Sequence, residues 1–219
     1  QTVNEIRSDQ CAAMVNSIKA ISSMDIAEKR RPQDGSFMAK IPQGSVFFRV
    51  ASSGVLGGEK LSIRVLNQST GRLGLNEIGL SEKTYNIVAE TVKQSSGMII
   101  MCGPTGSGKT TSLYAMLDMI DFYTRNVVTI EDPVEYVLDN ASQIEVNVKA
   151  NITFANTLRS ILRQDPDVIC VGEIRDGETA AMALQASQTG HLVLATLHSS
   201  SNMATLVRLM ELGIKPLLL

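Results

Sequence analysis

The pattern of apolar and polar residues changes near residue 81, and it predicts two parts of different architecture. Within residues 1–28, apolar side chains recur at helical spacing and form one broad face. Three short runs with the alternation or composition of β-strands follow, at Phe37–Ile41, Val46–Ala51 and Lys60–Leu66. One helix followed by three strands predicts a small α+β domain.

Turn-forming residues separate these runs. Residues 29–36 contain a Pro and a Gly among charged residues, which is typical of a turn. The Ser- and Gly-rich segment 52–58 is expected to be a flexible loop, and a second Gly-rich segment, 68–80, is expected to be a linker. The small α+β domain is therefore predicted to span residues 1–67.

From Ser81, which is suited to cap a helix, strand-like runs alternate with helical ones. Strands are predicted at 98–102, 127–131, 168–172 and 192–197, with a weaker candidate at 143–148, and helices after Ser81 and at 111–121, 154–164, 177–188 and 202–212. Near-continuous apolar strands are typical of a parallel sheet with helices on both faces. We predict such an α/β domain over residues 81–219, with its ligands at the carboxyl ends of the strands.

One segment of this second part has a specific chemical signature. Residues 103–110 match G-x-x-x-x-G-K-[ST] at each fixed position, between a predicted strand and a predicted helix. The glycines let successive backbone amides point at a polyanion, and the helix N-terminus adds partial positive charge. Lys109 is expected to reach the β- and γ-phosphates and Thr110 to ligate Mg²⁺. The alternative, a Gly/Ser-rich turn that binds nothing, fits this context poorly. The predicted nucleotide-binding residues here are Gly103, Pro104, Thr105, Gly106, Ser107, Gly108, Lys109, Thr110 and Thr111.

Polar residues follow three further predicted strands. Glu131, Asp132 and Glu135 come after the second strand, Glu173 follows an apolar run and a glycine, and His198 follows the last strand. A nucleotide hydrolase needs a metal ion, a carboxylate that orients water and a polar group that senses the γ-phosphate. Each of these three groups of residues also has a simpler interpretation. The acidic residues after the second strand can be a solvated turn, Glu173 can cap a helix, and His198 can be a structural histidine. Their joint occurrence downstream of residues 103–110 favours catalysis.

The composition of the chain limits its possible partners and cellular compartment. The chain has 219 residues, 44% of them hydrophobic, and a net charge of −2, so no global basic field indicates nucleic acid. No apolar run is long enough to cross a membrane, and no signal peptide is evident. The three cysteines lack metal-ligand spacing, which fits a reducing, cytoplasmic compartment. Because the chain lacks an initiator Met and stops in an apolar run, we expect it to be part of a longer protein.

With these motifs in order, the sequence resembles the motor ATPases of type II secretion and type IV pilus machines. The resemblance covers about residues 18–219, with specific blocks at 31–35, 103–111, 129–135, 158–176 and 189–198, the last four being the Walker A, Asp box, Walker B and His box of that family. It implies an ATPase that assembles as a homo-hexamer, with a PAS-like domain (1–67), a linker (68–80) and a RecA-like domain (81–219). In such motors ATP binds between the two domains, and their relative rotation drives the machine.

The resemblance also assigns roles by position. Glu173 is expected to activate the attacking water, with Glu135 supporting the metal ion or the water, and His198 to sense the γ-phosphate. The metal ligands implied are Thr110, Glu135 and Glu173, and the cofactors are ATP and Mg²⁺.

Four arginines also match the family. Arg49 and Arg64 correspond to a pair in the small domain that would neutralise transition-state charge when that domain closes on the phosphates. Arg159 and Arg163 share one face of a predicted helix and correspond to positions near the nucleotide or a subunit boundary. The alternative for each is a solvated surface charge.

The sequence departs from the family pattern as well. Ser36 stands where the family often has arginine, and Arg31 where it often has an apolar residue. A four-cysteine zinc module, present downstream of the His box in secretion and many extension motors, has no ligands here.

The function predicted is an ATP-hydrolysing motor subunit. It would be cytoplasmic, without direct membrane insertion, and peripheral to the inner membrane through the machine's platform proteins. Two alternatives remain open: a nucleotide-dependent switch or scaffold without useful turnover, and a RecA-like nucleic-acid translocase. Net charge and the lack of aromatic–basic clusters weigh against a nucleic-acid partner. The sequence leaves open secretion against pilus assembly, and extension against retraction.

Overall fold

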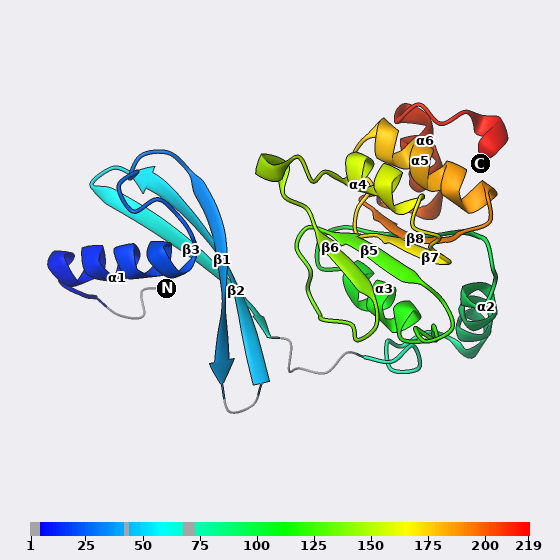
Figure 1. Cartoon of the computed structure of the whole chain (residues 1–219), viewed down its shortest axis with the longest axis horizontal. Coiled ribbons are helices and arrows are strands. Elements are labelled where there is room, and N and C mark those ends of the chain that lie inside the picture. The colour runs from blue at the N-terminus through cyan, green and yellow to red at the C-terminus, as the bar shows by residue number, and fades with distance from the viewer. Residues whose placement is uncertain (1–4, 42–43, 68–72) are drawn as a thin grey trace. The chain divides into compact units, whose positions relative to one another are not determined.

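A computed structural model describes residues 5–41, 44–67 and 73–219 of the chain (Figure 1). The chain divides into two compact units, residues 1–71 and 72–219. Each unit has its own sheet, so each is described by itself.

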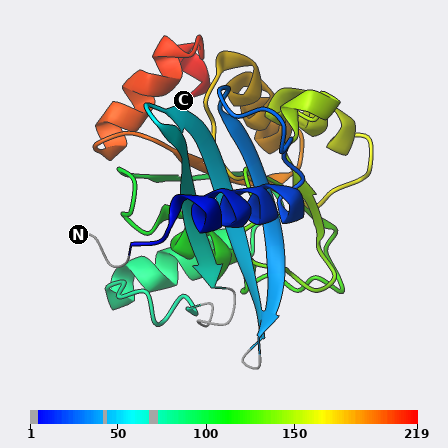
Figure 2. The same ribbon diagram turned by 90° about the vertical axis from the view of Figure 1, so that its left-hand side faces the viewer.

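The first unit consists of one helix and three antiparallel strands. Helix α1 (Ser8–Ile21) precedes β1 (Gln33–Ile41), β2 (Gly44–Val55) and β3 (Gly58–Asn67), which pair in chain order. Figure 2 shows α1 lying across the strands of this sheet. The side chains of β2 alternate in burial, and Val46 and Val50 belong to the covered face. The expected order of one helix and three strands is confirmed.

The segment 52–58, expected to be a flexible loop, is instead mostly strand. Strand β2 continues to Val55 and β3 starts at Gly58, which is paired with Val55. Only Leu56 and Gly57 form the turn between them. A two-residue hairpin turn requires positive φ, and Gly57 supplies it at +90°. The serines and glycines that suggested a loop therefore belong to a long twisted hairpin.

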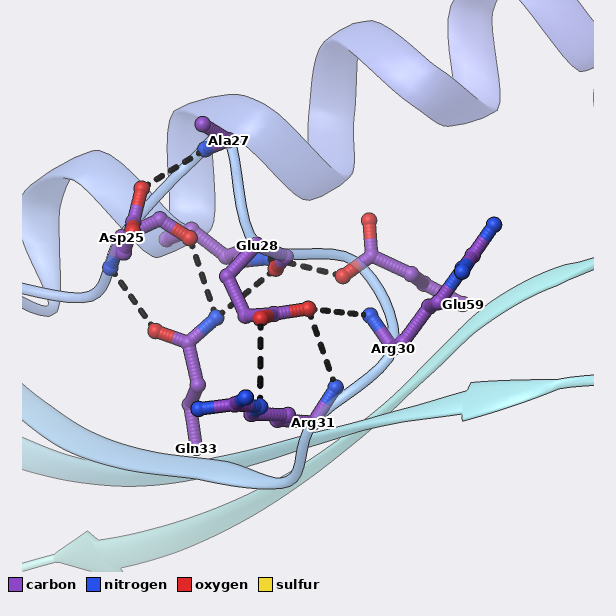
Figure 3. A network of polar contacts seen from close by, with 8 residues as sticks. Asp25, Ala27, Glu28, Arg30, Arg31, Gln33 and Glu59 are labelled. Carbon is purple, nitrogen blue, oxygen red and sulfur yellow. Dashed lines mark hydrogen bonds and ion pairs between the residues drawn. The ribbon is translucent and has the colours of Figure 1, made fainter.

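The connection between α1 and β1 is fixed by polar contacts (Figure 3). The Gln33 side chain accepts from Asp25 N at 2.8 Å and donates to Asp25 O and Glu28 O, both at 2.9 Å. The Glu28 carboxylate accepts from the backbone amides of Arg30 and Arg31, at 2.8 and 3.1 Å. This segment was predicted as a turn over residues 29–36, but residues 33–36 already belong to β1.

The second unit is built on a five-stranded sheet in which every pair is parallel, in the order β4-β8-β7-β5-β6. The strands are β4 (Gly97–Cys102), β5 (Val127–Glu131), β6 (Ser142–Glu145), β7 (Val168–Val171) and β8 (Leu192–Leu197). Every residue of β5, β7 and β8 is buried, which explains their near-continuous apolar sequences. The predicted parallel sheet is confirmed, and β6 ends at residue 145 rather than 148.

Helices cover both faces of this sheet. They are α2 (Glu82–Val92), α3 (Lys109–Leu117), α4 (Phe154–Ile161), α5 (Gly177–Gln188) and α6 (Asn202–Glu211), with single 3₁₀ turns at Val148–Ala150 and Pro216–Leu218. Figure 1 shows α2 and α3 on one face and α4, α5 and α6 on the other. Two apolar cores result, one on each face of the sheet. Because strand residues alternate between these cores, Ile130 packs with α4 while Thr129 and Glu131 face the α3 side.

Side-chain caps define where several helices begin. Ser81 Oγ accepts from Thr84 N, which confirms the predicted cap of α2. Thr153, Asp176 and Ser201 cap α4, α5 and α6 in the same way. The described part of segment 68–80 lies in the second unit, where Leu75 is buried against the α2–α3 core. Within the described residues, none of the helices combines the length and the apolar character needed to cross a bilayer.

Candidate nucleotide-binding site

The loop between β4 and α3 has the backbone geometry expected of residues 103–108. Gly103, Gly106 and Gly108 have φ values of +157°, +79° and +88°, in the region that side chains disfavour. A Cβ atom at Gly103 would lie 2.4 Å from Ser107 Oγ, so the tight turn of the loop also needs a glycine there. Helix α3 begins at Lys109, two residues earlier than predicted, so Lys109 and Thr110 lie in its first turn. The loop amides and the helix N-terminus together favour an anion.

The ammonium group of Lys109 lies against this loop. Its Nζ donates to Gly103 O at 2.8 Å and to Pro104 O at 2.9 Å. It also lies 3.5 Å from His198 Nδ1. Lys109 is thus held between the loop that it belongs to and the residue that follows β8.

Glu173 completes this connection. Its Oε1 lies 3.2 Å from His198 Nε2, and its Oε2 accepts from Arg175 Nε at 2.7 Å. Arg175 Nη1 in turn lies 3.1 Å from Asp132 Oδ2. The hydrogen bond with Glu173 raises the pKa of Arg175 above its ordinary value, so this arginine stays charged. Residues from the ends of β4, β5, β7 and β8 are therefore joined by short polar contacts.

These strand ends border an open cavity of about 380 Å³, a size within the range of small-molecule sites. Nine residues predicted for the site line it: Thr105, Gly106, Gly108, Lys109, Thr110, Thr111, Glu135, Glu173 and His198. The predicted acidic turn is a loop in the structure, and part of it lines the cavity; we call residues 132–138 the acid loop. Acidic, basic and hydroxyl groups thus face one cavity, beside a loop shaped for phosphate.

Gly172 explains how Glu173 comes so close to β5. A Cβ atom at this position would lie 3.0 Å from Ile130 O and 3.3 Å from Glu131 Cα. The Gly172 amide donates to Ile130 O at 2.8 Å, and its carbonyl accepts from Thr196 Oγ1. The glycine before Glu173 therefore lets the end of β7 lie directly against the end of β5.

Five predicted site residues of the second unit do not line this cavity: Gly103, Pro104, Ser107, Arg159 and Arg163. Arg159 on α4 is paired with Glu178 on α5, and Arg163, just beyond the end of α4, donates to Arg159 O at 3.0 Å. Arg49 and Arg64 belong to the first unit, where they are direct cross-strand partners on β2 and β3. Their predicted roles toward the nucleotide remain predictions.

Three further polar residues near the strand ends have structural contacts. Arg175 forms ion pairs with Glu173 and Asp132, whereas Asp176 caps α5 by accepting from Thr179 N at 2.8 Å. His191 lies at the opposite end of β8 from His198, with its Nδ1 3.0 Å from Ala186 O at the end of α5.

Sequence reasoning missed the buried partners of Glu131. The Glu131 carboxylate is 4% exposed and accepts from Tyr114 Oη and from Thr129 Oγ1, the latter at 2.6 Å. Gln143 Nε2 lies 3.2 Å from the same carboxylate. One signal was available, because Thr129 and Glu131 are two residues apart on a strand and so share a face. Tyr114 lies in an apolar stretch of α3 and gave no polar signal.

Among the described residues, no three His, Cys, Asp or Glu side chains are grouped closely enough to hold a metal ion by themselves. The donors here nevertheless suit Mg²⁺, because this ion typically takes one or two protein ligands together with phosphate oxygens and water. The Thr110 hydroxyl and the carboxylates of Glu135 and Glu173 face the same cavity.

Comparison with known proteins agrees with this geometry. A family model described as "Type II/IV secretion system protein" matches residues 1–219. The chain is 48% identical over 217 residues to the type II secretion system protein E of Pseudomonas aeruginosa, covering 99% of this chain and 43% of that protein. It is 44% identical over 206 residues to the type II secretion system ATPase E of Vibrio cholerae, covering 94% of this chain and 41% of that protein. The chain thus spans about two fifths of the length of these curated relatives.

Solved structures give the same picture of the fold. The pilus retraction motor PilT with bound ADP matches with a TM-score of 0.70 and 36% identity, over 86% of this chain and 53% of that one. The ATPase DotB of Legionella pneumophila matches with a TM-score of 0.76 and 26% identity, over 99% of this chain and 61% of that one. The parallel sheet is accordingly a RecA-like P-loop fold. Because a family model matches its whole length and a curated relative is nearly half identical to it, the chain belongs to the type II/IV secretion system protein family.

Proposed function

We propose that the chain hydrolyses Mg²⁺-ATP as part of a motor subunit of a type II secretion or type IV pilus machine. The observation that carries the proposal is the continuous contact from Lys109 through His198 to Glu173. These residues come from three strand ends and line one cavity with the phosphate-shaped loop. The names of similar proteins, a secretion ATPase and a pilus motor with bound ADP, support the nucleotide and the machine.

Each residue has a role that its position supports. Lys109 would neutralise the β- and γ-phosphates, with the loop amides and the N-terminus of α3. His198 lies between Lys109 and Glu173, so it is placed to contact the γ-phosphate and sense its loss. Glu173, held by Arg175 on one oxygen, would accept the proton of the attacking water with the other.

The metal ion would be held by Thr110 and by the carboxylates of Glu135 and Glu173, with phosphate oxygens and water completing the shell. Mg²⁺ bound there would neutralise charge that develops on the transferred phosphoryl group. Glu135 is the second candidate for orienting water, because it lines the same cavity from the acid loop.

The arginines of the first unit add an anion-binding element to the proposal. Arg49 and Arg64 lie directly opposite each other on β2 and β3. Like charges in this position destabilise a sheet, so the pair is easier to explain if it meets an anion. We propose that this anion is the polyphosphate of ATP and that the contact forms in a closing step of the motor. Arg159 and Arg163 are proposed to act near the nucleotide or at a subunit boundary.

We also propose that the active form is a homo-hexamer in the cytoplasm, bound at the inner membrane through platform proteins of the machine. The type II secretion proteins among the relatives support such partners.

A steady-state assay of phosphate release from ATP and Mg²⁺ tests the activity. Glu173→Gln keeps the size of the side chain but removes its basicity, so turnover should fall by roughly 10²–10⁴-fold while ATP binding persists. Lys109→Ala should weaken binding and turnover together. Normal turnover in both variants would overturn the proposal. Tight ATP binding without turnover in the wild type would favour a nucleotide switch, and salt-sensitive stimulation by DNA would favour a translocase.

A further inference from the structure

A buried polar cluster lies beneath the acid loop, between α3 and the ends of β5 and β6. Its members are Tyr114, Thr129, Glu131 and Gln143, together with the backbone of residues 136–138. Tyr114 and Thr129 are at most 2% exposed. The cluster links the helix that begins with the phosphate-binding lysine to the loop that carries Glu135.

The hydroxyl of Tyr114 joins two parts of this cluster. It donates its one proton to Glu131 Oε2 and accepts from the backbone N–H of Tyr136 at 3.2 Å. Burial, followed by the charge of Glu131, raises the pKa of Tyr114 far above its ordinary value, so the phenol stays protonated and remains a donor. The rings of Tyr114 and Tyr136 also meet edge to face, with centroids 5.0 Å apart.

Gln143 holds the remainder of the acid loop from β6. Its Oε1 accepts from Leu138 N at 2.7 Å, and its Nε2 donates to Tyr136 O at 2.9 Å. The same Nε2 lies 3.2 Å from Glu131 Oε1, so Gln143 and Tyr114 share the carboxylate as an anchor.

The backbone on each side of Glu135 is therefore attached to a side chain. Val134 N donates to Glu145 Oε2 at 3.2 Å, and Tyr136 N donates to the Tyr114 hydroxyl. Tyr114 lies five residues after Lys109 on α3, a distance of about 7 Å along the helix axis. A rigid helix thus connects the lysine of the phosphate loop to the amide that follows Glu135.

We propose that Tyr114 is a positioning residue for hydrolysis, which ties the acid loop to α3 and so fixes Glu135 relative to the phosphates bound at Lys109. The inference rests on the proposed ATP hydrolysis. Tyr114 acts through the backbone of the acid loop and does not touch the nucleotide. A displacement of about 1 Å at a reacting group can cost up to roughly 100-fold in rate, so losing the anchor would slow the chemical step more than binding.

Tyr114→Phe tests this, because it removes the hydroxyl and keeps the ring. The matched control is Tyr123→Phe, which makes the same change at a side chain that is 87% exposed. We expect Tyr114→Phe to lower kcat by about tenfold or more, with the Kd for a non-hydrolysable ATP analogue unchanged within about twofold, and the control to match the wild type. Equal kcat in the folded Tyr114→Phe protein, or equal losses in affinity and kcat, would overturn the proposal.

Two further measurements separate positioning from general destabilisation. The double variant Glu135→Gln with Tyr114→Phe should turn over ATP only slightly more slowly than Glu135→Gln alone, because the effect of Tyr114 passes through Glu135. If the two single losses multiplied in full in the double variant, the proposal would be contradicted. By hydrogen exchange, the Tyr136 amide should lose protection in Tyr114→Phe while the Leu138 amide, held by Gln143, keeps most of its own. If the wild type shows no turnover, the proposed hydrolysis fails, whereas an unchanged Tyr136 amide would refute the anchor in either case.

Discussion

Replacing Lys19 should destabilise the first unit selectively. The Lys19 side chain on α1 is fully buried, and its Nζ donates to Glu59 Oε1 at 2.7 Å and to Glu28 O at 2.6 Å. Glu59 on β3 is itself only 9% exposed. Lys19→Met therefore leaves a buried carboxylate without its cation.

The size of the effect follows from this geometry. Removing one partner of a buried ion pair costs about 3–5 kcal/mol. A unit of 71 residues is expected to have about 4–11 kcal/mol of stability, so this loss consumes much of the total. Replacing both partners, as in Lys19→Met with Glu59→Leu, removes the stranded charge and should recover most of the loss. The exposed Lys60 gives the matched control, Lys60→Met, with an expected change within about 0.5 kcal/mol.

Hydrogen exchange in increasing urea is the suitable assay, because the chain has no Trp to report on unfolding and exchange resolves the two units separately. We expect early exchange of β1–β3 in Lys19→Met, with protection of β5, β7 and β8 retained. If Lys19→Met were as stable as the wild type, the reasoning would be refuted. It would also be refuted if Lys19→Met with Glu59→Leu were as unstable as Lys19→Met alone, because the loss of stability would then come from lost packing.

Three smaller predictions follow from individual residues. The pKa of Glu28 is lowered in the folded protein because its carboxylate accepts from two backbone amides. Its contribution to stability is therefore present above the pKa of the unfolded state and is lost as the pH falls through the pKa of the folded state. Glu28→Gln should accordingly lower the Tm at pH 7 and leave the Tm nearly unchanged at pH 3. Gly172→Ala would press a Cβ to 3.0 Å from Ile130 O and should cost about 1–3 kcal/mol with a loss of turnover, measured by thermal unfolding and phosphate release; an unaltered Tm would contradict that close packing. Iodoacetamide should label the exposed Cys11 and spare Cys170, whose full burial raises its thiol pKa; labelling of Cys170 in the native protein would show that β7 opens readily.

Periodicity predicted the second unit well because its strands are buried on both faces. Runs such as Val168–Val171 have no polar interruption, and their alternation with helices predicts a parallel arrangement. Polar residues directly after such strands necessarily meet at one edge of the sheet. That rule predicts Glu173 and His198 near Lys109, and in the structure His198 contacts both Lys109 and Glu173.

Composition was misleading where backbone geometry determines the local structure. Serine and glycine in the segment 52–58 suggested a flexible loop, yet one glycine with positive φ is enough to join β2 and β3 tightly. The pairing of Lys19 with Glu59, 40 residues apart, depends on how α1 packs on the sheet. Local sequence carries no information about such a contact, and the same holds for Tyr114 and Glu131.

A crystal structure of the chain with a non-hydrolysable ATP analogue and Mg²⁺ would show whether Lys109, His198 and Glu173 meet the γ-phosphate. We expect the γ-phosphate within hydrogen-bond distance of both Lys109 Nζ and His198, with a Glu173 oxygen about 3 Å from a water aligned with the γ-phosphorus. A nucleotide bound with its phosphates outside this cavity, or a γ-phosphate that neither His198 nor Glu173 can reach directly or through one water, would contradict it.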